Sequence, residues 1–183
     1  RDENGNIYVT GTSEGNNSDL DFITLKFDGN GNLLWDSRYD YNGLVDIAAD
    51  IVVEKNGEQI TVTGGSEDTA GVWDYTTVTY DSNGNQISVA REPSDETDIK
   101  KPKDIVKDEG KNYYLTGIQH NGTDNDIKLI KLDSTLQNQW VQVYNEGNEG
   151  SNALTIDDSG HLYVGGWIEE GTGYRQFLLL KFD

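Results

Sequence analysis

Residues 5–13 read GNIYVTGTS, residues 21–35 read DFITLKFDGNGNLLW, and variants of this pair recur three more times along the chain. The later copies open with EQITVTGGS at 58–66, KNYYLTGIQ at 111–119 and GHLYVGGWI at 160–168. A period of about 50 residues made of short strands is typical of β-propeller blades and not of helical solenoids. The sequence therefore predicts an all-β fold, a β-propeller segment of four repeats.

Each repeat carries four strand signals, which we call a, b, c and d. In the second repeat they cover residues 49–54, 59–64, 74–80 and 85–91. Asn-Gly pairs at 56–57 and 83–84 favour tight hairpins, because this dipeptide tolerates positive φ at both central positions. The stretch DGNGN at 28–32 is also better explained as a hairpin turn than as a calcium loop, which needs glycine at its sixth position.

The c strands place apolar residues on both of their faces. In residues 22–27 and 177–182, apolar side chains occupy both alternating sets of positions. A sheet with one wet face would not have this pattern, but a blade packed between two neighbouring blades would. The strand order predicts two complete four-stranded blades plus partial blades at both ends.

The positions of the four copies predict how the repeats divide the chain. We expect a single β-propeller domain over 1–183, part of a larger propeller, with repeat units at about 1–45, 46–97, 98–148 and 149–183.

The composition excludes several classes of function. The net charge is −19, from 33 acidic and 14 basic residues, so a phosphate backbone would be repelled and nucleic acid is not an expected partner. The chain has no cysteine, which excludes disulfides, thiolate zinc sites and a cysteine nucleophile. No apolar run approaches the length of about 20 residues that a membrane-spanning helix needs.

The repeat GNIYVTGTS followed by DFITLKFDGNGNLLW resembles the bacterial β-propeller repeat known as the SBBP family. That repeat typically reads GNxYVTGxT and then DxxxxKxDxxGNxxW, and the resemblance covers nearly the whole chain. It implies a ring of roughly seven blades on secreted or surface-attached bacterial proteins, similar to surface proteins of Bacteroidota. The family carries no agreed catalytic motif, so the resemblance implies no functional residue. The third repeat departs from the pattern at 134–137, where STLQ replaces the Asn-Gly turn.

The loops between strands b and c supply candidate calcium ligands. Converging carboxylates on one face of a propeller could hold Ca²⁺, which takes six to eight oxygen ligands, and calcium is the one cofactor that we consider. The alternative is a solvated acidic rim, since loops of this type are surface by default. The candidates are Glu14, Asp19, Glu67, Asp68, Asp124 and Asp126.

Aromatic residues and histidines divide into core and binding-face candidates. Trp35 and Trp140 occupy the same repeat position, which predicts packing between blades. Trp73 and Trp167 do not recur, and an exposed tryptophan could stack on a sugar or anchor a protein partner. His120 lies in a b–c loop, but no nucleophile motif accompanies it, so we predict no catalytic residue.

We therefore expect a non-enzymatic scaffold or binding module, extracellular or on the bacterial cell surface. It would bind a protein or a glycan through its loop face, and it would contact neighbouring blades of the same or another chain. The N-glycosylation patterns at 16–18 and 121–123 agree with an extracellular setting. One alternative is a hydrolase or lyase, with or without a requirement for calcium, that has its active site at the central channel. Another is an assembly component that completes its sheet with strands from another chain.

Overall fold

The computed structural model describes residues 1–15, 19–92, 101–171 and 173–183. The glycosylation pattern at 16–18 and the boundary between the second and third repeat units lie outside these residues. The part of the chain that is described consists of strands and turns, and it holds no helix able to span a membrane.

The strands form four antiparallel sheets, one for each repeat. They are β1 (Ile7–Glu14), β2 (Leu20–Phe27) and β3 (Leu33–Tyr39); β4 (Asp46–Val53), β5 (Gln59–Glu67), β6 (Trp73–Asp81) and β7 (Gln86–Glu92); β8 (Lys101–Lys107), β9 (Tyr113–His120), β10 (Asn125–Leu132) and β11 (Asn138–Tyr144); and β12 (Asn148–Ile156), β13 (Leu162–Glu169) and β14 (Arg175–Phe182). The sheets have three, four, four and three strands, in the orders β1-β2-β3, β4-β5-β6-β7, β8-β9-β10-β11 and β12-β13-β14. The predicted arrangement of two complete blades and two partial blades is confirmed. Strand a of the second repeat begins at Asp46, three residues earlier than predicted, because a β-bulge between Ala48 and Asp50 lets the pairing continue.

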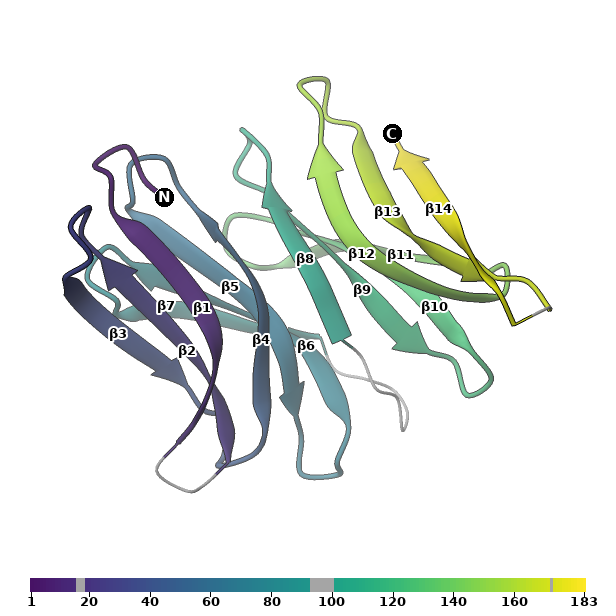
Figure 1. Ribbon diagram of the computed structural model, residues 1–183, viewed down its shortest axis with the longest axis horizontal. Coiled ribbons are helices and arrows are strands. Elements are labelled where there is room, and N and C mark those ends of the chain that lie inside the picture. The colour runs from purple at the N-terminus through teal and green to yellow at the C-terminus, as the bar shows by residue number, and fades with distance from the viewer. Residues whose placement is uncertain (16–18, 93–100, 172) are drawn as a thin grey trace. The chain divides into compact units, whose positions relative to one another are not determined.

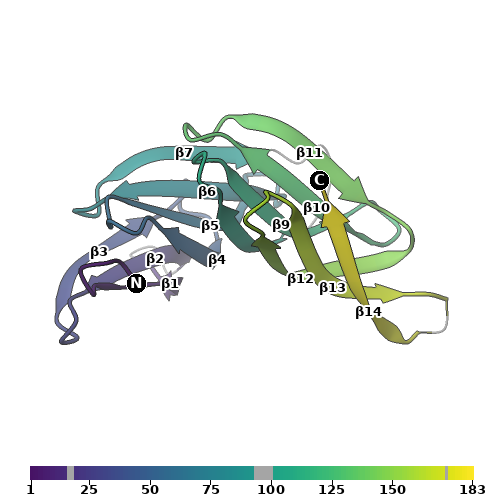
Figure 2. The ribbon, with the colours of Figure 1, turned by 90° about the horizontal axis from the view of Figure 1, so that it is seen from above.

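The chain divides into two compact units, Arg1–Pro93 and Ser94–Asp183. The first unit contains the sheets β1–β3 and β4–β7, and the second contains β8–β11 and β12–β14. Within each unit, the two sheets lie against each other as layers (Figures 1 and 2). The expectation of one domain over the whole chain stays a prediction.

The core of the first unit joins its two sheets. It consists of Tyr8, Phe22 and Tyr39 from the first sheet and Ile60, Val62, Val78 and Tyr80 from the second. Trp35 packs against this core, with its ring centroid 6.1 Å from that of Tyr8. Its Nε1–H donates to the carbonyl oxygen of Ser82 (3.0 Å), which also accepts from Lys26 Nζ (3.2 Å). Trp35 therefore packs between blades, as predicted.

The core of the second unit repeats this arrangement. It is made of Tyr114, Ile127, Leu129, Leu154, Leu162 and Val164, from β9, β10, β12 and β13. Trp140 packs on this cluster with its ring centroid 6.0 Å from that of Tyr114, so it occupies the same place as Trp35. The repeat-position argument for the two tryptophans is confirmed.

The two central strands of the second sheet, β5 and β6, are buried on both faces. Every residue of β5 and β6 is buried except the first and last of each strand. Gly64 shows how closely the first two sheets approach, because a Cβ there would lie 2.3 Å from both the Ile47 carbonyl oxygen and the Phe22 ring. A Cβ at Gly11, the equivalent position in the first repeat, would meet nothing within 4 Å.

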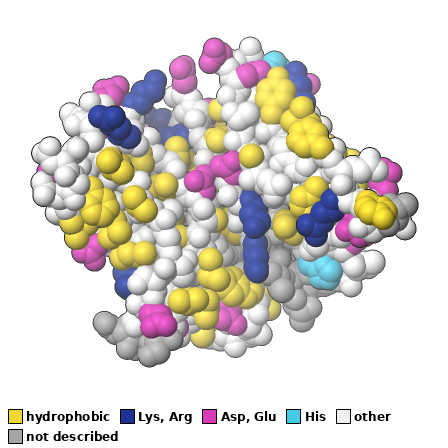
Figure 3. All heavy atoms as spheres, viewed as in Figure 1, with side chains coloured by type: hydrophobic (Ala, Val, Ile, Leu, Met, Phe, Trp, Pro, Cys, Tyr) yellow, Lys and Arg dark blue, Asp and Glu magenta, His cyan; other side chains and the backbone are white. Residues whose placement is uncertain are grey.

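The outer faces of the first and fourth sheets are apolar and exposed. Phe177 is 80% exposed, although its equivalent Phe22 is 0% exposed. Val9 is 46% exposed, although its equivalent Val62 is 0% exposed. Figure 3 shows hydrophobic side chains gathered where Figure 1 draws β1 to β3. These two faces therefore have the composition of blade-to-blade contacts.

Aspartates close the turns between strands c and d. The side-chain amide of Asn32 donates to Oδ2 of Asp28 (2.8 Å), and Oδ1 accepts the backbone N–H groups of Asn32 and Asn30; these bonds lower the pKa of Asp28. Asp81 makes the same bonds in the second repeat. The hairpin interpretation is thus confirmed. In the third repeat the turn keeps its shape without glycine, because Leu136 itself adopts a φ of 64°.

Candidate functional site

The loop edge where strand b ends and strand c begins differs from one repeat to the next. The last residue of strand b is Glu14, Glu67, His120 or Glu169 in the four repeats. Two residues before the repeated c-strand pattern, which begins at Asp21 in the first repeat, the four repeats have Asp19, Val72, Asp124 and Tyr174. The framework repeats but the chemistry of its edge does not, so this edge is where a function specific to one repeat can lie.

An ion pair between an arginine and a buried aspartate anchors this edge in the first two repeats. Arg38 donates to Oδ2 of Asp21 (2.9 Å) and to the carbonyl oxygen of Ser13 (2.9 Å). Arg91 makes the equivalent bond to Oδ2 of Asp74 (2.9 Å). Asp21 and Asp74 were not among the predicted site residues, although their shared repeat position and the matching arginines were a usable signal.

Asp21 belongs to a cluster of three carboxylates with Asp19 and Asp40. One carboxylate oxygen from each residue lies within 4.8 Å of the others. Asp21 is 1% exposed, and burial raises its pKa; the neighbouring charges of Asp40 and Asp19 raise it further, while Arg38 opposes the shift. Asp19 lies in the b–c loop just before β2, and Asp40 follows β3, so the fold brings together residues from two separate connections.

The third repeat has the equivalent pair, Asp124 and Asp126, in a different state. The side-chain amide of Asn121 donates to Oδ1 of Asp124 (2.6 Å) and to Oδ1 of Asp126 (3.0 Å). Oδ1 of Asn121 in turn accepts the backbone N–H groups of Thr123 and Asp124. A neutral donor therefore lies between these two carboxylates.

Two further acids are buried at the start of strand a. Asp46 is 0% exposed and accepts the backbone N–H of Tyr41 (2.7 Å), and burial raises its pKa to about 6. Glu149, its equivalent in the fourth repeat, accepts the N–H of Glu146 (2.7 Å), and burial raises its pKa. Neither residue was predicted, because nothing in the local sequence distinguishes a buried acid from an exposed one.

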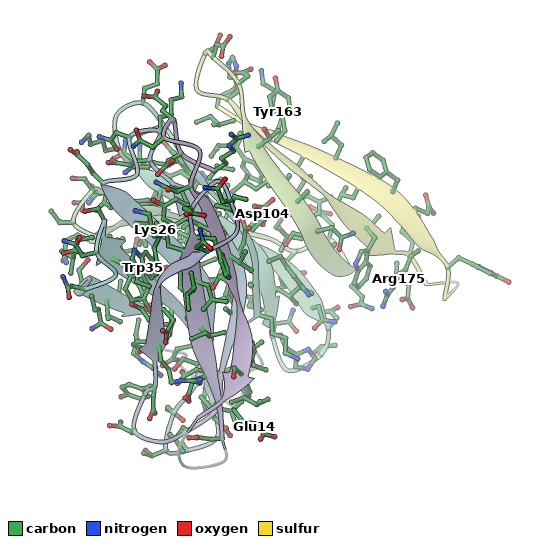
Figure 4. The ribbon with its side chains drawn as sticks, turned by 60° about the vertical axis from the view of Figure 1, so that its left-hand side comes forward. Glu14, Lys26, Trp35, Asp104, Tyr163 and Arg175 are labelled. Carbon is green, nitrogen blue, oxygen red and sulfur yellow. The ribbon has the colours of Figure 1, made fainter. Side chains whose placement is uncertain are left out.

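The other predicted calcium ligands are not members of the three-carboxylate cluster. Glu14 pairs with Leu20 at the same edge of the first sheet, and its side chain is exposed at the end of β1, where Figure 4 shows it far along the sheet from Lys26 and Trp35. Glu67 is the last residue of β5. Oδ1 of Asp68 accepts the backbone N–H groups of Ala70 and Val72, so this carboxylate closes a turn.

The predicted binding-face residues occupy three different environments. Trp73 is the half-buried first residue of β6, and His120 is the half-buried last residue of β9. Trp167 is paired with Phe177 across β13 and β14, and the Arg175 guanidinium lies 3.8 Å from its ring centroid. Trp167 therefore lies on the outer face of a sheet and not in a loop. The aromatic residue that a b–c loop does expose is Tyr174, at 77%.

No protein-family model and no curated protein matches this chain. Among solved structures, a subtype N11 neuraminidase-like protein of A/flat-faced bat/Peru/033/2010 (H18N11) is similar, with 12% sequence identity and a TM-score of 0.53. The match covers 97% of this chain and 57% of the neuraminidase-like protein. A GH43 endo-arabinanase from Bacillus licheniformis has 12% identity over 99% of this chain and 91% of its own, with a TM-score of 0.37. The first likeness and the four repeated antiparallel sheets define the class: this is a β-propeller fold.

Proposed function

We propose that this chain is a non-enzymatic β-propeller scaffold and binding module of a secreted or cell-surface bacterial protein. The observation that carries the proposal is the contrast between a repeated framework and a loop edge that changes from repeat to repeat. Asp19, Val72, Asp124 and Tyr174 occupy one repeat position with three chemistries. The resemblance of the repeat to SBBP sequences supports the extracellular setting and the bacterial origin.

A glycan is the ligand class that we favour, and Tyr174 is the residue that favours it. Its side chain is 77% exposed, and an exposed aromatic ring can stack on the apolar face of a sugar. The neighbouring pair of Glu169 and Arg175 (3.9 Å) offers a hydrogen-bond acceptor and donors for hydroxyl groups. Figure 4 shows Arg175 at the loop end of the fourth sheet, away from Tyr163.

A printed glycan array followed by calorimetric titration of the strongest binder tests this function. We expect binding without release of reducing ends, and at least a tenfold loss of affinity in Tyr174→Ala. Asn121→Ala, in another b–c loop, serves as the matched control and should keep the affinity. Turnover of the bound glycan would support the hydrolase or lyase alternative, and absence of glycan binding would leave a protein partner.

A second candidate function is assembly, and the exposed apolar faces of the end sheets favour it. The face with Ile7 and Val9 is equivalent to the face that the second sheet buries in the core of the first unit. The face with Phe177 and Leu179 is equivalent to the face of the first sheet that contains Phe22, which packs against the second sheet in that core. The two faces are thus of complementary types, and each could pack against a blade of this protein or of another chain.

Light scattering of wild type and of Val9→Ser and Phe177→Ser tests assembly. If the two faces associate between copies, the wild type should show a concentration-dependent mass that both variants lose. A wild type that stays monomeric at all concentrations would contradict association of copies.

A further inference from the structure

The three-carboxylate cluster of the first repeat has an excess of buried acceptors. Both carboxylate oxygens of Asp19 and Oδ1 of Asp21 are inaccessible to solvent and have no hydrogen-bond partner among the described residues. Burying an ionised carboxylate without a partner is strongly unfavourable. Arg38 donates to Oδ2 of Asp21, and among the described residues no cation is paired with the other oxygen of Asp21 or with Asp19.

The second and third repeats show how the carboxylates at this edge find partners within the chain itself. In the second repeat, the sequence has Val72 at the position of Asp19 and Pro93 at the position of Asp40, and Asp74 forms an ion pair with Arg91 (2.9 Å). In the third, Asn121 places an amide donor between Asp124 and Asp126. The first repeat keeps all three acids together, and among its described residues no donor lies between Asp19 and Asp21.

We propose that Asp19, Asp21 and Asp40 bind one Ca²⁺ ion at the loop edge of the first blade. The ion would take the place that the Asn121 amide occupies in the third repeat. This proposal goes beyond the binding function proposed above, because it assigns a metal site to residues outside the Tyr174 loop.

The donor set fits calcium. All of the candidate ligands are carboxylate oxygens, which Ca²⁺ prefers, and there is no imidazole or thiolate in the cluster to favour zinc. Both oxygens of Asp19 and Oδ1 of Asp21 are available, because Arg38 binds only Oδ2 of Asp21. Oδ1 of Asp40 accepts the N–H of Gly43 (2.7 Å), which orients this carboxylate and leaves Oδ2 as its ligand. Water would complete the six to eight ligands that Ca²⁺ takes.

The backbone around the cluster is built for close approach. A Cβ at Gly15 would lie 2.2 Å from Oδ2 of Asp21, so a larger residue there would displace the carboxylate that Arg38 binds. The N–H of Gly15 donates to the carbonyl oxygen of Asp19 (2.8 Å), which holds Asp19 beside Asp21. The cluster is therefore positioned by backbone contacts as well as by Arg38.

Calorimetric titration of the chelator-treated protein with CaCl₂ tests the proposal. We expect one site with a dissociation constant of about 0.1–1 mM, the range of extracellular calcium modules. Asp40→Asn should weaken binding at least tenfold while keeping the acceptor for Gly43. Asp19→Asn should do the same, and it provides a second variant outside the buried ion pair.

Asp124→Asn is the matched control, since it removes the same charge at the equivalent position of the third repeat. It should bind Ca²⁺ like the wild type. Thermal unfolding supplies a second readout, in which CaCl₂ raises the melting temperature of the wild type and KCl at equal ionic strength does not. Absence of binding heat, an equal effect of KCl, or unchanged binding in both Asp40→Asn and Asp19→Asn would overturn the proposal. Folding of each variant is checked by circular dichroism.

Discussion

Replacement of Phe22 by alanine should strongly destabilise the first unit, whereas the same replacement at the equivalent Phe177 should not destabilise the second. Phe22 is 0% exposed, lies 5.4 Å from the ring of Tyr39 between centroids, and fills the space over Gly64. Removal of such a ring loses its full transfer free energy and leaves a cavity, for a cost of about 3–5 kcal/mol.

Phe177 is 80% exposed, so only a fifth of its surface is withdrawn from water. Full burial of a phenylalanine side chain contributes about 1.5–3 kcal/mol, so Phe177→Ala should cost about 0.3–0.6 kcal/mol. Urea unfolding followed by tryptophan fluorescence and circular dichroism would measure both values at low protein concentration. Ile127→Ala, at the equivalent buried position in the second unit, serves as the control that this unit responds to a core cavity.

A large cost for Phe177→Ala would refute the reasoning, because it would mean that the outer face of the fourth sheet is covered in solution. A small cost for Phe22→Ala would refute it in a different way, since the two sheets of the first unit would then not share a core. Repeating the measurement at higher protein concentration separates association of copies from a covered face within one chain.

Three further predictions concern close approach, titration and the contact between blades. Gly64→Ala should lower the free energy of unfolding by about 1–3 kcal/mol through overpacking, and Gly11→Ala, measured in the same urea titration, should change it little. Because folding raises the pKa of Asp46 from 3.8 to about 6, the folded state holds this proton more tightly, and stability should fall as the pH rises between these values. When melting temperatures are compared at about pH 4.5 and about pH 7, Asp46→Asn should lack the part of the decrease that comes from this residue. Trp35→Phe keeps an aromatic ring but removes the donor to the Ser82 carbonyl oxygen and part of the packing of the larger indole, so urea unfolding should show a loss of at least about 1 kcal/mol.

The strands and their order could be predicted because the same pattern of strands and turns occurs in all four repeats. Asn56-Gly57 and Asn83-Gly84 determine hairpin turns locally, and the shared position of Trp35 and Trp140 signals a packing role that both residues have. Such features depend on neighbouring residues in the chain or on comparison between copies, and both are visible in one sequence.

The acidic cluster could be predicted only in part. Asp19 was a candidate because it lies in a b–c loop, but Asp40 comes from the connection after β3 and reaches the cluster only through the register of β2 and β3. Asp21 is buried at the start of β2, the central strand of its sheet, and the composition of the loop does not reveal this burial. The position of Trp167 depends on the strand register too, since pairing with Phe177 places its ring on a sheet face.

Amide hydrogen exchange with and without CaCl₂ tests the account most directly, because it reports on the stacked sheets and on the edge of the first blade together. We expect the slowest exchange in β5, β6, β9 and β10 under both conditions, since these strands are the most buried. Calcium should slow exchange further only in the peptides around Asp19–Phe22 and Asp40–Leu44. Fast exchange in the central strands would contradict the stacked-sheet fold, and calcium protection elsewhere, or none, would contradict the assigned site.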